Sequence, residues 1–161
     1  MENLEITFGN FTITTDKSKM DIDAIHDFLS KYSGWSDNIP FDTVKTSIEN
    51  SLNFGLFYNQ QQIGFARVIS DFSTIAYLGD IYVLENYRGQ GLSKKLMDAI
   101  VSHPNLQGLR RWILLTSTAD WGSDPKVVER IKKSDFCYYK KAEIWMIHLR
   151  VYYPFYYQMV Y

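Results

Sequence analysis

The chain has 161 residues, of which 46% are hydrophobic and 16% aromatic, and this favours one folded domain over a disordered or two-domain chain. Its 17 basic and 18 acidic side chains leave a formal net charge of −1, so we expect no nucleic-acid partner. The single cysteine, Cys137, excludes an internal disulfide and a thiolate-rich metal site.

The first third of the chain predicts extended segments followed by two helices. Residues 4–15 mix β-branched and aromatic side chains around a turn-prone Gly-Asn pair, which predicts two short strands or one interrupted strand. Apolar residues at helical spacing predict amphipathic helices over 20–32 and 40–52. The segment 34–40 between them is expected to be a loop.

A hairpin and a third strand follow. Residues 54–58 and 63–70 are rich in β-branched and aromatic side chains and flank a polar Asn-Gln-Gln-Gln stretch, which predicts a β-hairpin. Residues 75–84 predict the third strand. Arg67 and Asp71 flank a strand end, and we expect them to form a structural ion pair.

The strongest chemical signal stands between this strand and the next helix. Residues 88–93 are Arg-Gly-Gln-Gly-Leu-Ser, and apolar residues at helical spacing continue through 92–100 until a His-Pro pair ends the helix. Two glycines at a helix start let backbone amides approach a ligand without Cβ obstruction, which predicts a phosphate site. The alternative is a tight strand-to-helix turn without a ligand.

The last third of the chain predicts further alternation of strands and helices. Residues 112–116 form a short apolar strand, residues 125–133 a polar helix, and residues 136–139 and 143–151 closing strands. No internal repeat or long linker divides the chain. The sum is one mixed α/β domain.

The glycine stretch and its surroundings resemble the GNAT-type N-acetyltransferases, which move an acetyl group from acetyl-CoA to an amine. The acetyl-CoA motif of that family is Arg/Gln-x-x-Gly-x-Gly/Ala after a strand, and residues 88–93 depart from it only in the last small position, a serine. The likeness covers about residues 32–115. Within this range, the sequence most resembles a bacterial subgroup of small GNAT proteins, in segments 54–56, 63–68, 76–78 and 103–109.

This resemblance implies a fold and a co-substrate. The fold is of the α/β (α+β) type, with a mixed, mostly antiparallel central sheet that is flanked by helices and splayed open between two parallel strands. Acetyl-CoA would lie in the opening, where Ile81, Tyr82 and Val83 present backbone groups to the pantetheine. The motif residues would surround the pyrophosphate: Arg88, Gly89, Gln90, Gly91, Leu92 and Ser93.

One part of the family pattern is missing. Relatives carry a helix with Leu-Tyr-Glu-Lys after the strand that matches 112–116, and its tyrosine can protonate the departing thiolate of CoA. Here an atypical segment, 118–142, takes its place, with tyrosines only at Tyr138 and Tyr139. Either another residue serves as the acid, or the thiolate leaves with solvent protonation, or the transferase activity is weak or absent.

Amine acetylation needs an acceptor for the amine proton and a hydrogen-bond donor to the carbonyl oxygen as it gains charge. The resemblance assigns the second task to the amide of Val83. Asp80 and Glu85 are the nearest carboxylates for the first task. Alternatively, the Asp80 carboxylate forms hydrogen bonds that support the glycine loop, and Glu85 is a solvated charge on a loop. Tyr82 lies either beside the substrate or in the core.

Two further groups of residues are candidates for ligand contact. In the resembled fold, the loop between the first two helices borders the acceptor groove, which makes Trp35 and the preceding Tyr32 candidate walls for the substrate. The alternative is that Trp35 packs onto the core. Lys94 and Lys95 face either the CoA phosphates or solvent.

The remaining features concern location and partners. The N-terminus lacks the pattern of a signal peptide, and no run approaches the roughly 18 apolar residues of a spanning helix, so we expect a cytoplasmic protein with no membrane partner. His26, His103 and His148 lack metal-ligand spacing, so no metal is predicted. The aromatic tail, 152–161, is expected to pack on its own sheet or on a second subunit, which makes a homodimer a hypothesis.

We therefore predict a single GNAT domain over 1–161 that acetylates a primary amine of a small molecule or peptide by direct attack on acetyl-CoA. The alternative is a catalytically weak or inactive acyl-CoA-binding or regulatory module. A third interpretation is a structural domain whose glycine loop is only a turn.

Overall fold

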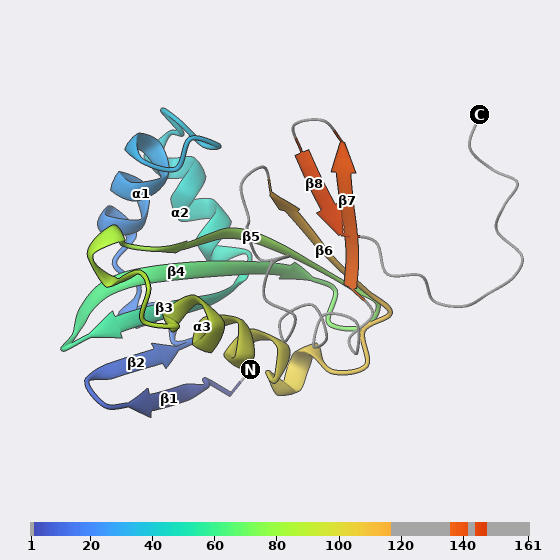
Figure 1. Ribbon diagram of the computed structural model, residues 1–161, viewed down its shortest axis with the longest axis horizontal. Helices are drawn as coiled ribbons and strands as arrows, with labels where there is room; N and C mark the ends of the chain where they lie inside the picture. The colour runs from blue at the N-terminus through green and yellow to red at the C-terminus, as the bar shows by residue number, and fades with distance from the viewer. Residues whose placement is uncertain (1, 117–135, 142–143, 148–161) are drawn as a thin grey trace, which may run out of the picture.

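The computed structural model describes residues 2–116, 136–141 and 144–147 (Figure 1). The strands are β1 (Glu5–Phe8), β2 (Phe11–Thr14), β3 (Leu52–Tyr58), β4 (Gln61–Ser70), β5 (Ile75–Val83), β6 (Arg111–Thr116), β7 (Phe136–Lys141) and β8 (Ile144–Ile147). The helices are α1 (Ile22–Lys31), α2 (Phe41–Glu49) and α3 (Leu92–Val101), with the 3-10 turns η1 (Lys17–Lys19), η2 (Glu85–Tyr87) and η3 (Pro104–Leu106).

The strands form a mixed sheet that is mostly antiparallel. Strands β1 to β5 pair with their neighbours in chain order, and all four of these pairs are antiparallel. Strand β6 is parallel to β5 and to β7, and β8 is antiparallel to β6 and β7. The expected fold class is thus confirmed, and the extended segment at 4–15 is a hairpin of two short strands.

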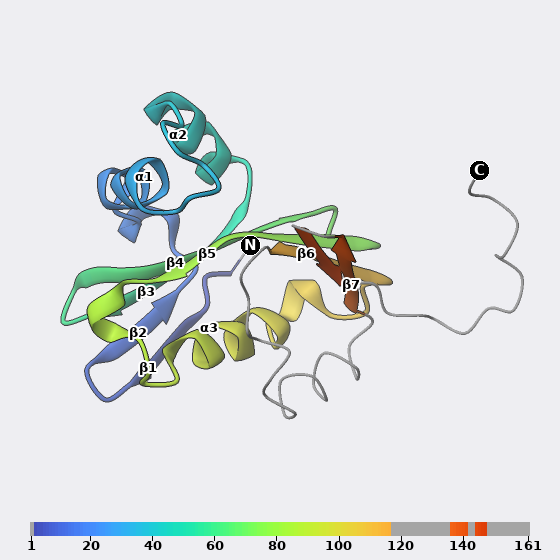
Figure 2. The ribbon, with the colours of Figure 1, turned by 45° about the horizontal axis from the view of Figure 1, so that its top comes forward.

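The helices cover both faces of the sheet. Figure 2 shows α1 and α2 on one face and α3 on the other. The apolar stripe of α3 packs into the larger core cluster, whereas α1 and α2 pack into a second cluster. Helix α1 begins after Asp21, whose carboxylate accepts a hydrogen bond from the amide of Ala24 at 3.0 Å. Within the described residues, no helix is long and apolar enough to span a membrane.

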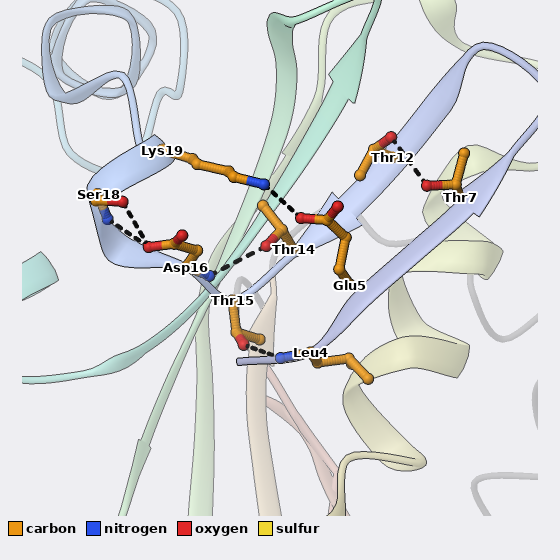
Figure 3. A network of polar contacts seen from close by, with 9 residues as sticks. All are labelled: Leu4, Glu5, Thr7, Thr12, Thr14, Thr15, Asp16, Ser18 and Lys19. Carbon is orange, nitrogen blue, oxygen red and sulfur yellow. Dashed lines mark hydrogen bonds and ion pairs between the residues drawn. The ribbon is translucent and has the colours of Figure 1, made fainter. Parts of the chain in front are cut away.

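A polar network ties the β1–β2 hairpin to η1 (Figure 3). The carboxylate of Asp16 accepts hydrogen bonds from the amide and the hydroxyl of Ser18, at 3.0 and 2.7 Å. Lys19 forms an ion pair with Glu5 of β1 at 2.5 Å. Both side chains of this pair are half exposed, so the pair adds little to stability.

Several predicted features lie outside the described residues. They are the helix at 125–133, most of the atypical segment 118–142, the aromatic tail 152–161 with the homodimer hypothesis, and His148. The side chains of Cys137, Tyr138 and Tyr139 are also outside, although the backbone of β7 is described.

The expected pair of Arg67 and Asp71 is wrong. The carboxylate of Asp71 organises the β4–β5 turn: it accepts hydrogen bonds from the amides of Ser73, Thr74 and Ile75 at 2.8 to 3.1 Å and from the Thr74 hydroxyl at 2.5 Å. Arg67 instead binds Asp80. The amides of the turn have no other local hydrogen-bond partner, so the nearby Asp71 carboxylate accepts their hydrogen bonds instead of pairing with Arg67.

This turn predicts a pH-dependent contribution to stability. The hydroxyl of Thr74, followed by the three turn amides, holds the pKa of the Asp71 carboxyl well below its ordinary value. Because the folded-state pKa is lowered, the contribution is complete above the unfolded-state pKa of about 4 and is lost as pH falls below it. The gap in thermal midpoint between wild type and Asp71→Ala should therefore narrow between pH 7 and pH 3. A gap of equal size at both pH values would contradict this role.

Candidate functional site

Strand β5 contains an extra residue near its C-terminal end. One residue of β4 there faces two residues of β5, Asp80 and Ile81, and the flanking ladder pairs are Phe65–Tyr82 and Arg67–Gly79. Asp80 has a φ of 54°, in the left-handed region that few residues other than glycine adopt and that aspartate tolerates better than most. This arrangement is a β-bulge, which bends the strand and disrupts its ladder locally.

The bulge decides which way the end of β5 faces. In a regular strand Leu78 and Val83, five positions apart, would point to opposite faces of the sheet. Here both belong to the core cluster on the α3 side, while Tyr82 belongs to the cluster of α1 and α2. The extra residue therefore reverses the alternation of side chains beyond Asp80.

The same end of β5 has an open edge. Pairing with β6 covers only Ile75 to Leu78, and Figure 1 shows the two strands diverging beyond it; no described strand pairs with that edge further along. The amide of Leu84 donates to the carbonyl of Ile63 at 2.8 Å, on the β4 side. Since neighbouring residues of an antiparallel strand direct their amides to opposite sides, the amide of Val83 faces the open edge.

A glycine-lined helix start follows this edge. Gly89 and Gly91 have φ values of 76° and 72°, and Gly91 caps α3 without a side-chain hydrogen bond. A Cβ built on either glycine meets no atom within 4 Å, so the space over the first turn of α3 is open. The first amides of a helix have no partner within it and lie at the positive end of its dipole, which suits a phosphate group.

The other motif residues surround this helix start in different ways. Arg88 ties the loop to the strand, because its Nε donates to the carbonyl of Val83 at 3.0 Å. Gln90 and Ser93 are exposed beside the glycines, whereas the side chain of Leu92 is buried in the core and leaves only its backbone for a ligand. Lys95 lies 5.2 Å from the ring centroid of Phe8, so its ammonium is directed to the hairpin.

Aromatic rings connect the expected acceptor wall to β5. The ring of Tyr82 stacks on Phe28 of α1 at a centroid distance of 3.7 Å. Tyr32 and Trp35 lie 6.3 and 6.4 Å from the same Phe28 ring, and they are 69% and 53% exposed. The structure thus brings Tyr32, Trp35 and Tyr82 together through Phe28, which the sequence pattern marks only as a core position.

These surroundings fix the protonation state of one candidate. Burial raises the pKa of the Tyr82 hydroxyl far above its ordinary value, with smaller effects from Asp21 and Asp80. A tyrosine hydroxyl with an ordinary pKa of about 10 is already protonated at neutral pH, and burial disfavours its ionised form further, so Tyr82 is a poor base.

The two candidate carboxylates differ in their surroundings. Asp80 is largely buried and binds the Nε of Arg67 at 2.7 Å, so it does not support the glycine loop. Glu85 begins η2 and is exposed, and its carboxylate forms no hydrogen bond or ion pair with another residue in the described part of the chain. No group of three or more His, Cys, Asp or Glu side chains could hold a metal ion in the described part of the chain.

This chain is similar to one known protein family and to solved structures of its members. The model of the acetyltransferase (GNAT) family matches residues 22–122. A crystal structure of a protein assigned to the GNAT family from Xanthomonas campestris pv. campestris is 45% identical, with a TM-score of 0.68 over 77% of this chain and 84% of that chain. A protein of Gibberella zeae that is named as an acetyltransferase is 29% identical over 133 residues, which are 69% of this chain and 74% of the relative.

A more distant structure shares the fold. It is a GNAT family acetyltransferase from Elizabethkingia anophelis with acetyl-CoA bound, 12% identical, with a TM-score of 0.56 over 89% of this chain and all of that chain. At this identity the likeness concerns the fold alone.

The aromatic contacts predict unequal effects of truncation. Phe28→Ala should lower the free energy of unfolding by about 3–5 kcal/mol, because it removes a buried ring and leaves a cavity under Tyr82. Tyr32→Ala should cost less than about 1 kcal/mol, because Tyr32 is mostly exposed. Urea unfolding of both variants measures the difference, and equal losses would contradict the described packing.

Proposed function

The chain belongs to the GNAT acetyltransferase family, and we propose that it transfers an acetyl group from acetyl-CoA to a primary amine of a small molecule or peptide by direct attack. The observation that carries this proposal is the open edge of β5, which is joined through η2 and the glycine loop to the start of α3, where no side chain caps the helix. A strand edge and a helix start in sequence suit a long ligand with amide groups at one end and phosphates at the other.

The residues present fit such a co-substrate. A Cβ at Gly89 or Gly91 would fill the open space beside the first amides of α3, where the pyrophosphate would lie. Arg88, Gln90 and Ser93 would line this space with their side chains, and Leu92 with its amide. The backbone of Ile81, Tyr82 and Val83 would hold the pantetheine along the edge of β5. A structure of the same fold holds acetyl-CoA, which supports acetyl-CoA as the co-substrate proposed here.

The chain's own groups would then serve the reaction as follows. Bound acetyl-CoA would supply an acetyl thioester: the amine nitrogen would bond to the carbonyl carbon, the C–S bond would break, and the released CoA thiolate would take a proton from another residue or from solvent. The amide of Val83 faces the open edge, and it would donate a hydrogen bond to the carbonyl oxygen as that oxygen gains negative charge. Glu85, whose carboxylate is exposed, would accept the proton of the amine directly or through water. Tyr82 stays protonated, so it would line the site or donate a hydrogen bond rather than act as a base.

The acceptor would approach from the side of α1 and α2. Tyr32 and Trp35 expose their rings next to Phe28, which stacks on Tyr82 one residue from Val83. We assign these two rings to the wall of the acceptor groove, where they would pack against the carbon skeleton that carries the amine.

The alternative function is an acyl-CoA-binding module with weak or no turnover. The observation that favours it is the missing Leu-Tyr-Glu-Lys stretch after β6, whose tyrosine, in the resembled family, can protonate the departing thiolate. Both functions share the CoA site, and they differ only in turnover.

Two measurements on one sample test the proposal. Calorimetric titration with acetyl-CoA and with CoA reports binding, and a free-thiol assay over a panel of amines reports transfer. Saturable binding with amine-dependent thiol release is the expected result. Binding without release from any amine favours the binding module, and a folded protein that binds neither ligand would overturn both.

The CoA site predicts a specific effect at Gly91. Gly91→Ala should raise the dissociation constant of CoA by about tenfold or more, because the added methyl group enters the space beside the helix amides. Gly108→Ala is the matched control: Gly108 has the same φ of 72°, has the same open surroundings and lies beyond the other end of α3.

Both variants should lose similar stability, since each forces a side chain into the left-handed region. Equal CoA affinity of the two variants in calorimetry would reject the loop as the phosphate site.

A further inference from the structure

The buried ion pair on the α1–α2 face joins the bulge to the neighbouring strand. The Nε of Arg67 lies 2.7 Å from Oδ2 of Asp80, and the two side chains are only 17% and 14% exposed. Arg67 pairs with Gly79 in the ladder, so without the bulge Asp80 would point to the opposite face. The ion pair therefore forms only when β5 is bulged at this position.

A second contact anchors Arg67 to the end of α2. Its Nη1 donates to the hydroxyl of Ser51 at 3.3 Å, and that hydroxyl donates to the carbonyl of Ser47 at 2.6 Å. The fully buried amide of Asn53 donates to the carbonyls of Ile48 and Ser51 at 2.7 and 3.2 Å, which fixes the chain where α2 enters β3. The guanidinium is thus held between α2 and the bulge.

We propose that Asp80 and Arg67 are positioning residues for acetyl transfer: their ion pair holds β5 in its bulged register, and this register aims the amide of Val83 at the open edge. The inference rests on the proposed function, because the amide matters only if a thioester lies there. Asp80 is then not the base that deprotonates the amine, since its carboxylate is already bound by Arg67.

The residue types suit this task. Aspartate accepts the left-handed backbone of the bulge better than most residues, and its short carboxylate reaches the guanidinium from there. A charge-assisted hydrogen bond in a largely buried site is strong, and removal of either side chain leaves the other without its hydrogen-bond partner. Asparagine shares the backbone tolerance and keeps an acceptor oxygen, whereas alanine has neither.

The test compares Asp80→Asn, Asp80→Ala, Arg67→Ala and the double alanine variant in the full chain. We expect Asp80→Asn to keep kcat within about fivefold of wild type with an unchanged pH profile, because the hydrogen bond from Arg67 survives. Asp80→Ala and Arg67→Ala should each lower kcat by about 100-fold, because each variant would misplace the amide of Val83. The double alanine variant should have a kcat no lower than that of either single variant. Glu5→Ala, which removes the exposed ion pair with Lys19, is the control and should match wild type.

Different outcomes separate this inference from the proposed function. If Asp80→Asn is as inactive as Asp80→Ala and its pH profile flattens, Asp80 is the base and the positioning role is overturned. Additive losses in the double variant would also overturn it.

If the wild-type protein acetylates none of the amines, the proposed function fails, and amide hydrogen exchange tests the ion pair directly. Exchange over residues 79–84 should be about tenfold faster in Asp80→Ala than in Asp80→Asn. Equal exchange in the two variants would reject the positioning role.

Discussion

Side chains of a strand alternate strictly between two faces, and one inserted residue reverses that alternation for everything that follows. In this chain the insertion is at Asp80, and two packing arrangements depend on it. Beyond the bulge, Val83 enters the core beneath α3 and Tyr82 stacks on Phe28 of α1. The same sequence in a regular strand without a bulge would place Tyr82 in the α3 core and Val83 against the ring of Phe28. The bulge and the packing on both faces therefore specify one another.

The candidate site combines three structural parts that come from separate segments of the chain. A strand edge offers backbone amides in a fixed direction, a helix start offers unpaired amides and a dipole, and an aromatic group offers an apolar wall. Arg88 connects the first two through its hydrogen bond to Val83, and Phe28 connects the strand to the third. Because each part is supported by a different element, the proposed reaction centre depends on the sheet that holds them at fixed distances.

Much of this arrangement could be predicted from the sequence, because periodicity and glycine placement are local signals. The helices at 22–31 and 92–101 fall within or close to the predicted ranges, and the glycine loop lies at the helix start as expected. The bulge has no clear signal in the sequence, because apolar side chains fill both of the last two positions of β5, Tyr82 and Val83, and both are buried. The partner of Arg67 depends on that bulge. Chain proximity therefore wrongly favoured Asp71, whose carboxylate is used by its own turn.

The two hydrophobic clusters lie on opposite faces of the sheet and share few side chains, with Leu84 packed against both. This separation has an evolutionary consequence. Substitutions of exposed residues in the loop between α1 and α2, such as Trp35, leave Phe28, the bulge and the α3 cluster in place. Under the proposed function, a lineage can therefore exchange its acceptor while it keeps the proposed donor site, and laboratory selection for a new amine should begin in that loop rather than at the helix start.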